Sequence, residues 1–251
     1  MKFFLFIVLF GFTSFAYSYN TYNLADRFSD VDFAENENIP TWGVGNHLGE
    51  GAVISYNFAE SAYFAAPDYS CGGHIVGDSC VSVSTFMPEG YQGVISSAFD
   101  VWEEAANLSF TQVVGQTGDV IVGGGALVGS NTLGYGGFNV SYDSSVPSFS
   151  SISSGFLDFD RDIDWSDSDI LFGVALHEIG HVLGLKHSDD SNSMMYYLYS
   201  SDTNSLQPDD IAGIQYLYGA PVSAVPEPST YLLFLLGLAM VVGYGRKAKA
   251  N

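Results

Sequence analysis

Basic residues are scarce in this sequence. Seven lysines and arginines stand against 28 aspartates and glutamates in 251 residues, and four of the seven lie close to the two ends. A surface of this kind repels nucleic acid and anionic lipid headgroups, so we expect no nucleic-acid partner. We interpret the acidity mainly as an aid to solubility in an exported or salt-exposed protein. Electrostatic steering of basic substrates is the alternative.

Cysteine is equally scarce. The only two, Cys71 and Cys80, lie in the run CGGHIVGDSC, and neither belongs to a CxxC pair of the kind that holds a structural zinc. In an exported protein, two cysteines and no third favour one disulfide that closes a short loop. Two free thiols are the alternative.

The start of the chain has the features of an export signal. Lys2 precedes an apolar run over residues 3–12, and small residues follow at Ala16 and Ser18. This order predicts a signal peptide over residues 1–18. The apolar run is too short for a comfortable membrane span.

The last part of the chain, residues 221–251, contains three successive features. Pro226-Glu227-Pro228 is followed by an apolar run over residues 231–244 and then by basic residues. Physically this is a stiff spacer, a hydrophobic helix that can enter a bilayer, and a basic stop that stays in the cytoplasm. A permanent single-span anchor is one interpretation of this order.

The same tail resembles the PEP-CTERM sorting signal of Gram-negative bacteria. The resemblance implies an exosortase-type processing enzyme as a partner and a transient insertion into the inner membrane. It also implies export across that membrane and release to the cell surface or the extracellular matrix. We therefore favour sorting over permanent anchoring.

Between the two ends the sequence has room for one domain, preceded by an N-terminal arm over residues 19–50. The elements predicted from periodicity and composition are a strand at 51–58, a helix at 92–108, strands at 110–114 and 119–122, and an edge strand at 133–138. Strands and helices in this order indicate an α/β (α+β) fold. We expect a monomer.

The run HEIGHVLGLKH at residues 177–187 is the strongest chemical signal in the sequence. Capping candidates and an apolar segment precede it, so we expect a helix that starts near residue 169. His177 and His181, four residues apart, then share one face and can take two corners of a zinc tetrahedron. Glu178 lies one step round the helix, where its carboxylate reaches the water on the metal.

Gly184 predicts where this helix ends, because glycine readily adopts the left-handed conformation that turns the chain back. His187, three residues later, can then supply a third ligand from outside the helix. Three protein ligands leave one position for water, as in catalytic zinc sites. A lone HExxH occurs by chance in many helices, but here three of the chain's five histidines coincide with a suitably placed glycine.

The extended motif resembles that of the metzincin zinc metalloproteases, and of their matrixin (matrix metalloproteinase-like) branch in particular. By this resemblance Met195 is the methionine of the turn beneath the metal. Other segments that resemble matrixin elements are 95–113, 118–122, 155–165 and 206–219. The resemblance implies a metzincin-type catalytic domain over residues 51–220, with a twisted mixed sheet, two long helices and a C-terminal helix.

The sequence departs from the matrixin pattern at the second, structural zinc, which the family holds largely with histidines. Residues 134–136 (GYG) fall at one such histidine and Asp158 falls at another. The two spare histidines, His47 and His74, lie elsewhere in the sequence. We therefore expect no structural zinc.

Two further sites are hypotheses. Asp158, Asp160 and Asp162 alternate in sequence and offer oxygen ligands to Ca²⁺, and by the resemblance Asp160 matches a calcium ligand of the family. A solvated acidic strand end is the alternative. Tyr197 follows Met195 by two residues, where serralysin and astacin relatives place a tyrosine that contacts the zinc.

These patterns together predict an exported zinc-dependent endopeptidase. Zinc on the three histidines would activate a water, with Glu178 as the general base. A peptide or protein substrate would lie along the edge strand at 133–138 and add a strand to the sheet. The alternative is a non-catalytic zinc-binding surface or matrix protein on a metalloprotease scaffold.

Overall fold

A computed structural model describes residues 39–43, 48–60, 74–76, 80–128, 132–142, 150–200 and 204–222. The predicted signal peptide lies outside these residues, as does the predicted sorting tail apart from its first two residues. The chain divides into two compact units, Met1–Pro221 and Val222–Asn251, and every element named below belongs to the first. Within the described residues, no helix has both the length and the apolarity to cross a membrane.

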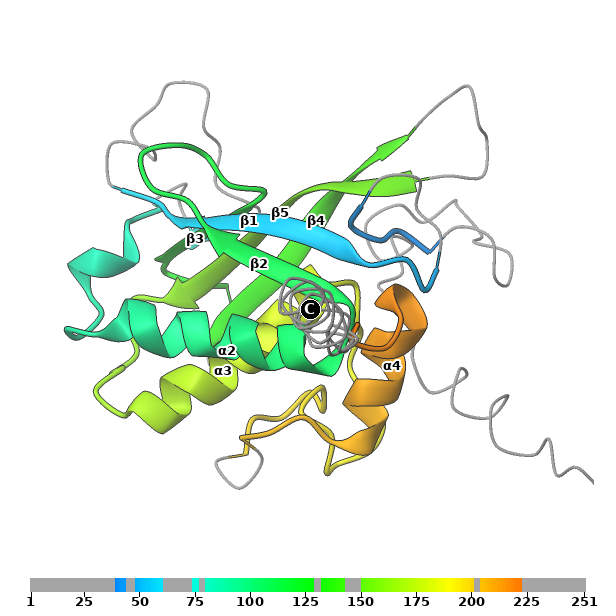
Figure 1. Ribbon diagram of the computed structural model, residues 1–251. Coiled ribbons are helices and arrows are strands. Elements are labelled where there is room, and N and C mark those ends of the chain that lie inside the picture. The colour runs from blue at the N-terminus through cyan, green and yellow to red at the C-terminus, as the bar shows by residue number, and fades with distance from the viewer. Residues whose placement is uncertain are drawn as a thin grey trace, which may run out of the picture. The chain divides into compact units, whose positions relative to one another are not determined.

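Five strands form one twisted, mixed sheet (Figure 1). They are β1 (Ala52–Phe58), β2 (Leu108–Gln112), β3 (Val120–Gly125), β4 (Gly134–Tyr142) and β5 (Ser150–Asp160). The order across the sheet is β2-β1-β3-β5-β4, and only the β4–β5 pair is antiparallel. The predicted mixed sheet is confirmed. β4 forms one edge, and one of its sides faces no other strand of the described sheet.

The strand residues alternate between the two faces of the sheet. In β1, Ile54 and Tyr56 are buried, whereas Val53 is 78% exposed, because successive strand residues point to opposite faces. β4 extends beyond the predicted edge strand, and β5 was not predicted as a strand. Both strands are rich in serine and glycine, which carry little intrinsic strand preference. Their pairing with each other is what makes these residues extended.

Three α-helices and one 3-10 helix complete the described fold. They are η3 (Val83–Thr85), α2 (Tyr91–Ala105), α3 (Ser168–Val182) and α4 (Pro208–Tyr218). Helices α2 and α3 pack against each other on the same side of the sheet (Figure 1). The two long helices and the C-terminal helix agree with the predicted architecture.

Burial of an apolar stripe fixes α2 against α3 and the sheet. Ile95, Phe99 and Trp102, at helical spacing, are fully buried, as expected for the inner face of an amphipathic helix. The indole Nε1–H of Trp102 donates to the carbonyl oxygen of Leu176 in α3 over 2.9 Å. Helix α3 is therefore fixed to the core through the face that packs against α2, and its exposed residues lie on the other face.

The start of α3 is set by a side-chain cap. Asp167 is the N-cap, and its Oδ1 accepts from the backbone N–H groups of Asp169 at 2.9 Å and of Ile170 at 3.4 Å. These bonds satisfy donors that have no partner inside the helix. The helix begins at Ser168, within one residue of the predicted start.

Part of the predicted N-terminal arm packs at the other end of α3. Trp42 is buried, and its Nε1–H donates to the carbonyl oxygen of Val182 over 2.9 Å. The hydroxyl of Tyr218 in α4 donates to the carbonyl oxygen of Leu183 over 2.8 Å and accepts from the backbone N–H of Trp42 at 3.2 Å. Carbonyl groups at the end of α3 thus receive side-chain donors from two distant parts of the chain.

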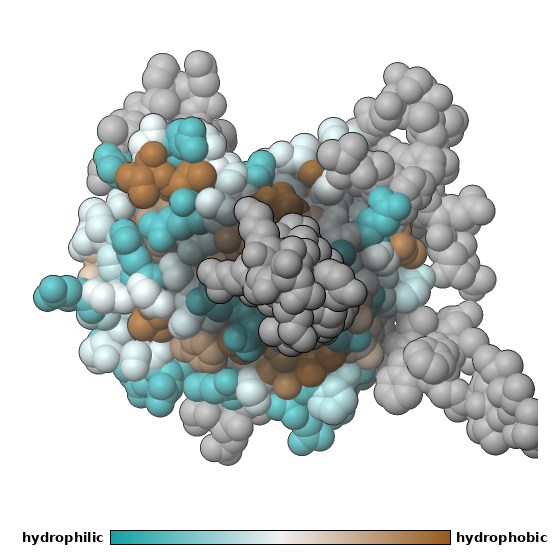
Figure 2. Space-filling model, viewed as in Figure 1, coloured by the Kyte–Doolittle hydropathy of each residue, from teal (hydrophilic) through white to brown (hydrophobic). Residues whose placement is uncertain are grey.

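The face shown in Figure 2 is mixed in polarity. Apolar side chains gather in separate patches, and hydrophilic side chains lie between them. This distribution agrees with the high acidic content of the sequence and with the ordinary composition of protein surfaces.

The cap of α3 gives a stability prediction. Asp167→Ala leaves two helix N–H groups without acceptors and should lower the free energy of unfolding by about 0.5–2 kcal/mol. Asp167→Asn is the matched control, because asparagine caps as well as aspartate but has no charge. Chemical denaturation of both variants is the measurement. Equal losses in the two would show that charge, and not the cap, is what matters at this position.

Candidate metal centre

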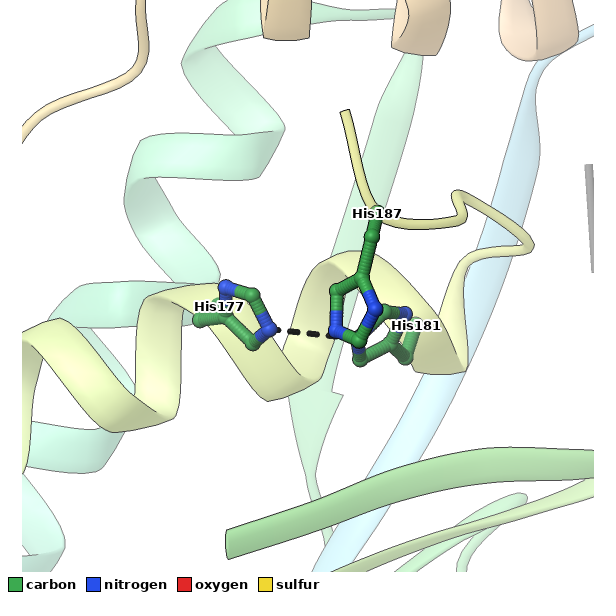
Figure 3. A group of neighbouring side chains, drawn as sticks. All are labelled: His177, His181 and His187. Atoms are coloured by element: carbon green, nitrogen blue, oxygen red, sulfur yellow. Dashed lines mark hydrogen bonds between the residues drawn. The ribbon is translucent and has the colours of Figure 1, made fainter. Parts of the chain in front are cut away.

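Three histidines converge at the end of α3 (Figure 3). His177 and His181 project from one face of the helix, one turn apart, and His187 comes from the chain after it. The Nε2 atom of His181 lies 3.1 Å from Nε2 of His177 and 3.2 Å from Nε2 of His187. Within the described residues this is the only group of three or more His, Cys, Asp or Glu side chains placed to share an ion.

A left-handed turn returns His187 to the helix. Gly184 has a φ of +99°, a conformation that costs glycine little. The backbone N–H of Leu185 donates to the carbonyl oxygen of Gly180 over 2.9 Å, and that of Gly184 donates to His181 over 3.0 Å. These bonds close the helix in the way the sequence predicts at Gly184.

Backbone carbonyls orient the two helical imidazoles. Nδ1 of His177 lies 2.7 Å from the carbonyl oxygen of Met194, and Nδ1 of His181 lies 2.8 Å from that of Leu185. A carbonyl only accepts, so each Nδ1 carries the proton and each Nε2 turns an unprotonated nitrogen towards the cluster. Metal-binding histidines are oriented by bonds of this kind.

The cluster fits a zinc ion in spacing and in charge. Two nitrogens about 2.0–2.1 Å from one tetrahedral zinc are about 3.3 Å apart, close to the two observed separations. Burial lowers the pKa of His177, and burial and its histidine neighbours lower that of His181 further. His187 is more exposed, but loss of hydration around its inward nitrogen and the neighbouring His177 lower its pKa to about 4. The imidazoles are therefore neutral near pH 7, as metal binding requires.

Glu178 links the cluster to the edge of the sheet. Its Oε2 accepts from the backbone N–H of Gly136 in β4 over 2.6 Å. Burial raises the pKa of Glu178 to about 7, although the Gly136 bond opposes the rise. A carboxyl group with a pKa near neutrality can take up and release a proton under ordinary conditions.

Strand β4 approaches α3 closely at two glycines, and at Gly136 it lies directly against the helix backbone. A β-carbon at Gly136 would overlap the carbonyl oxygen of Glu178, and one at Gly134 would lie 2.8 Å from the Glu178 Cγ. Only glycine is compatible with this separation. The sequence analysis noted the glycines here but did not assign them this role.

Met195 packs beneath the histidine helix. It is fully buried, and a β-carbon at Gly180 would overlap its sulfur. The methionine thus fills the space left by the glycine between the two helical histidines. The observed contact is one of packing, because the sulfur lies against the helix at Gly180, and the family role assigned to Met195 by resemblance stays a prediction.

Asp210, in the first turn of α4, organises the segment Ser193–Tyr196, which we call the methionine turn. Its carboxylate is fully buried and accepts from the Ser193 hydroxyl at 2.5 Å and from the backbone N–H groups of Met194 at 2.8 Å and Met195 at 3.0 Å. Met194 in turn supplies the carbonyl that orients His177. Sequence reasoning missed Asp210, although the pattern of a capping box at Gln207 and Asp210 could have drawn attention to it.

Tyr197 lies next to the cluster but on its exposed side. Its ring centroid is 6.4 Å from that of His187, its side chain is 59% exposed, and its hydroxyl is hydrogen-bonded to Tyr196. The predicted contact between Tyr197 and zinc stays a prediction.

The predicted calcium site is not supported. Asp158 and Asp160 are buried, so a solvated strand end is also the wrong description of them. The Asp160 carboxylate accepts from the backbone N–H groups of Asp162 at 2.8 Å and Leu127 at 3.4 Å. Asp158 is engaged by a histidine, and these acidic side chains form no group placed to share an ion. Their oxygens serve hydrogen bonds within the domain.

The histidine at Asp158 is His74. Its Nε2 lies 2.8 Å from Asp158 Oδ2, so His74, which is 84 residues away in the sequence, reaches this position in space. No sequence signal marked this contact.

His47 and Cys71 lie outside the described residues. Cys80 is disulfide-bonded, and its pairing with Cys71 stays a prediction.

Two neutral histidines on a helix and a third from the chain that follows, with a carboxyl group and an edge strand beside them, form a group that could hold one metal ion. A family model described as Matrixin matches residues 81–219, more than half of the chain. The chain belongs to the matrixin family. A second family model, the PEP-CTERM protein-sorting motif, matches residues 224–249. Both resemblances noted in the sequence are confirmed.

Curated relatives show the same likeness. Macrophage metalloelastase of Oryctolagus cuniculus is 36% identical over 149 residues, which make up 56% of this chain and 31% of that protein. Stromelysin-2 of Rattus norvegicus is 35% identical over 152 residues, 56% of this chain and 32% of that protein. Matrix metalloproteinase-18 of Xenopus laevis is 37% identical over 150 residues, which make up 54% of this chain and 31% of that protein. The matches span about a third of the length of these relatives.

The buried carboxylate of Asp210 gives a second stability prediction. Asp210→Ala leaves several buried donors unpaired and should lower the free energy of unfolding by about 3–5 kcal/mol. The methionine turn should loosen with it, so the variant should also retain less zinc. Asp209→Ala is the matched control, because the Asp209 side chain is only partly buried and accepts a hydrogen bond from the Ser188 hydroxyl. Denaturation and zinc analysis of both variants check this, and equal effects would contradict it.

The pKa of Glu178 gives a prediction for zinc binding. At pH 6 a group with a pKa of about 7 is mostly protonated, and a neighbouring cation favours its ionised form. Zinc binding at pH 6 should therefore release about one proton from Glu178, while the histidines, with lowered pKa values, release few. Titration calorimetry in two buffers of different ionisation enthalpy measures the release. Glu178→Gln should abolish most of it, and an unchanged release would contradict the assignment.

Proposed function

We propose that this protein is an exported zinc-dependent endopeptidase in which His177, His181 and His187 hold the metal and Glu178 is the general base. One observation carries the proposal. Three imidazole nitrogens converge within bonding range of one ion, and the carboxylate of Glu178 lies beside them with a bond to the edge strand. A site that only bound zinc would not need this carboxyl group.

Zinc, when bound, would polarise a water molecule and the carbonyl group of the scissile bond. Glu178 would take the proton from the attacking water at its carboxylate and pass it to the nitrogen of the leaving amine. The bond from Gly136 N–H to Glu178 Oε2 would keep the carboxylate oriented between these two positions. The raised pKa of Glu178 suits a group that accepts and then donates a proton.

The substrate would bind as an extended peptide along β4. This strand is the edge of the described sheet, and an added strand can bond to the backbone groups on its unpaired side. Gly136, beside Glu178, would place the scissile bond close to the base. The residues after the methionine turn, 196–200, would form the pocket for the side chain that follows the cut.

Location and partners follow from the two ends of the chain. The signal peptide predicted at 1–18 and the sorting motif at 224–249 support export across the inner membrane and release to the cell surface or beyond. An exosortase-type enzyme would process the tail after transient insertion of its hydrophobic helix. The strong negative charge of the protein suits an extracellular role without nucleic acid, and a monomer suffices for the site.

A non-catalytic zinc-binding protein on the same scaffold is the competing function. It would keep the three histidines and would be indifferent to Glu178. Burial works against the charged form of this carboxyl group, so a scaffold with no use for it would lose nothing by replacing it. We therefore favour catalysis.

The test compares the zinc-loaded full chain with Glu178→Gln on an unstructured protein substrate. Loss of the general base should lower kcat by at least about 100-fold, while zinc content stays equal. Glu104→Gln, which changes an exposed glutamate in α2, is the matched control and should behave as the wild type. A chelator should abolish hydrolysis by the wild type. Equal hydrolysis by wild type and Glu178→Gln would refute the catalytic role.

A further inference from the structure

His74 lies in a buried aromatic setting far from the metal ligands in sequence. Its ring stacks on Tyr135, with centroids 4.3 Å apart and planes within 4°, and on Phe156, with centroids 4.9 Å apart and planes within 13°. Its Nε2 pairs with Asp158 at 2.8 Å. His74 is 8% exposed. Three separate contacts thus hold one imidazole.

All three partners of His74 belong to the two strands at the edge of the sheet. Tyr135 in β4 is directly paired with Asp158 in β5, so their side chains lie on the same face. Phe156, two residues before Asp158, points to that face as well. Gly134 and Gly136, on either side of Tyr135, face α3. His74 therefore holds β4 from the face opposite Glu178.

Apart from its backbone pairing with β5 and the bond from Gly136 to Glu178, this part of β4 has little side-chain packing to hold it. Residues 134–137 read Gly-Tyr-Gly-Gly, and glycine in a strand loses much conformational freedom and offers no side chain for packing. Tyr135 is the one side chain in the run. The ring of Phe156 lies across Gly137, where a β-carbon would come within 2.5 Å of it. The stack of Tyr135, His74 and Phe156 is thus the side-chain anchor of the whole run.

The segment that carries His74 is itself fixed to the sheet. The backbone N–H of Val76 donates to the carbonyl oxygen of Ala126 over 2.8 Å, and that of Val128 donates to the carbonyl oxygen of His74 over 2.8 Å. Ile75 forms an antiparallel bridge with Leu127 and is buried against it. Because the backbone of His74 is fixed in this way, its imidazole can in turn fix the position of Tyr135.

We propose that His74 is a positioning residue for the substrate-binding edge. Pairing with β5 makes residues 134–137 extended, and His74, by stacking on Tyr135 and bonding to Asp158, holds this run in position beside α3, so that the unpaired side of β4 is ready to receive a peptide. His74 touches neither the substrate nor the metal ligands and acts through Tyr135. The inference rests on the proposed function, since it concerns the same peptide-binding edge.

The test uses the zinc-loaded full chain and two readouts. In His74→Ala, amide hydrogen exchange at residues 134–137 should rise by about tenfold or more, while exchange in α3 stays unchanged. The KM for an extended peptide should rise about tenfold, with a smaller change in kcat and none in zinc content. Val76→Ala is the matched control: its side chain is 55% exposed on the same segment, and both readouts should stay at the wild-type level.

Variants of Tyr135 identify the route of the effect. Tyr135→Phe keeps the stacked ring and should therefore stay nearer to wild-type exchange and KM than Tyr135→Ala does. Tyr135→Ala should reproduce His74→Ala, and the double variant should be no worse than either single variant, because both remove one shared contact. Additive effects would overturn the proposal that His74 acts through Tyr135.

The remaining outcomes are also decisive. Unchanged exchange at 134–137 in His74→Ala, or an equal rise throughout the domain, would overturn the proposal.

If His74→Ala does not fold, two other variants separate the contacts of His74. His74→Gln keeps a donor for Asp158 without the ring, and His74→Phe keeps the ring without the donor. Exchange in β4 should then be faster in the glutamine variant than in the phenylalanine variant, and the reverse order would overturn the stacking role. If the wild type cuts no peptide, only the proposed function is refuted. The role of His74 is still tested, because amide hydrogen exchange does not depend on catalytic activity.

Discussion

The site depends on the close approach of helix α3 to strand β4. The helix supplies two imidazoles and the carboxylate of Glu178, and the strand supplies the backbone edge and the N–H that bonds to this carboxylate. The strand contributes no side chain to this contact because Gly134 and Gly136 face the helix, and Gly136 lies against the backbone of Glu178. Any larger residue there would force them apart and separate the proposed base from the place where a peptide would lie.

Hydrogen bonds from distant parts of the chain keep the ligands of this site oriented. The carboxylate of Asp210 in α4 holds the methionine turn, and Met194 within that turn holds His177 by its carbonyl group. Trp42 and Tyr218 bond to the last carbonyls of α3. These bonds fix the orientation of the imidazole rings, so little of their conformational freedom remains to be lost when an ion binds.

The glycines that permit the close approach also leave β4 poorly anchored on that side. Beyond the backbone pairing with β5, side-chain packing of this run can come only from the opposite face, where Tyr135 is the only side chain that the run offers. The stack of Tyr135 with His74 and Phe156 supplies this anchor. The same strand is thus held from one face by aromatic packing and approached from the other by the helix that carries the site.

The sequence by itself determined the local features. The spacing of His177, His181 and His187, with Gly184 between them, was enough to predict a helix, its end and a metal cluster, because these depend on helical periodicity and on the conformational freedom of glycine. The tertiary structure alone decided the contacts between distant segments. His74 meets Asp158 across 84 residues, Asp210 reaches the methionine turn, and two of the three aspartates expected to bind calcium, Asp158 and Asp160, are buried in hydrogen bonds. Such contacts follow from strand order and register, which no local pattern encodes.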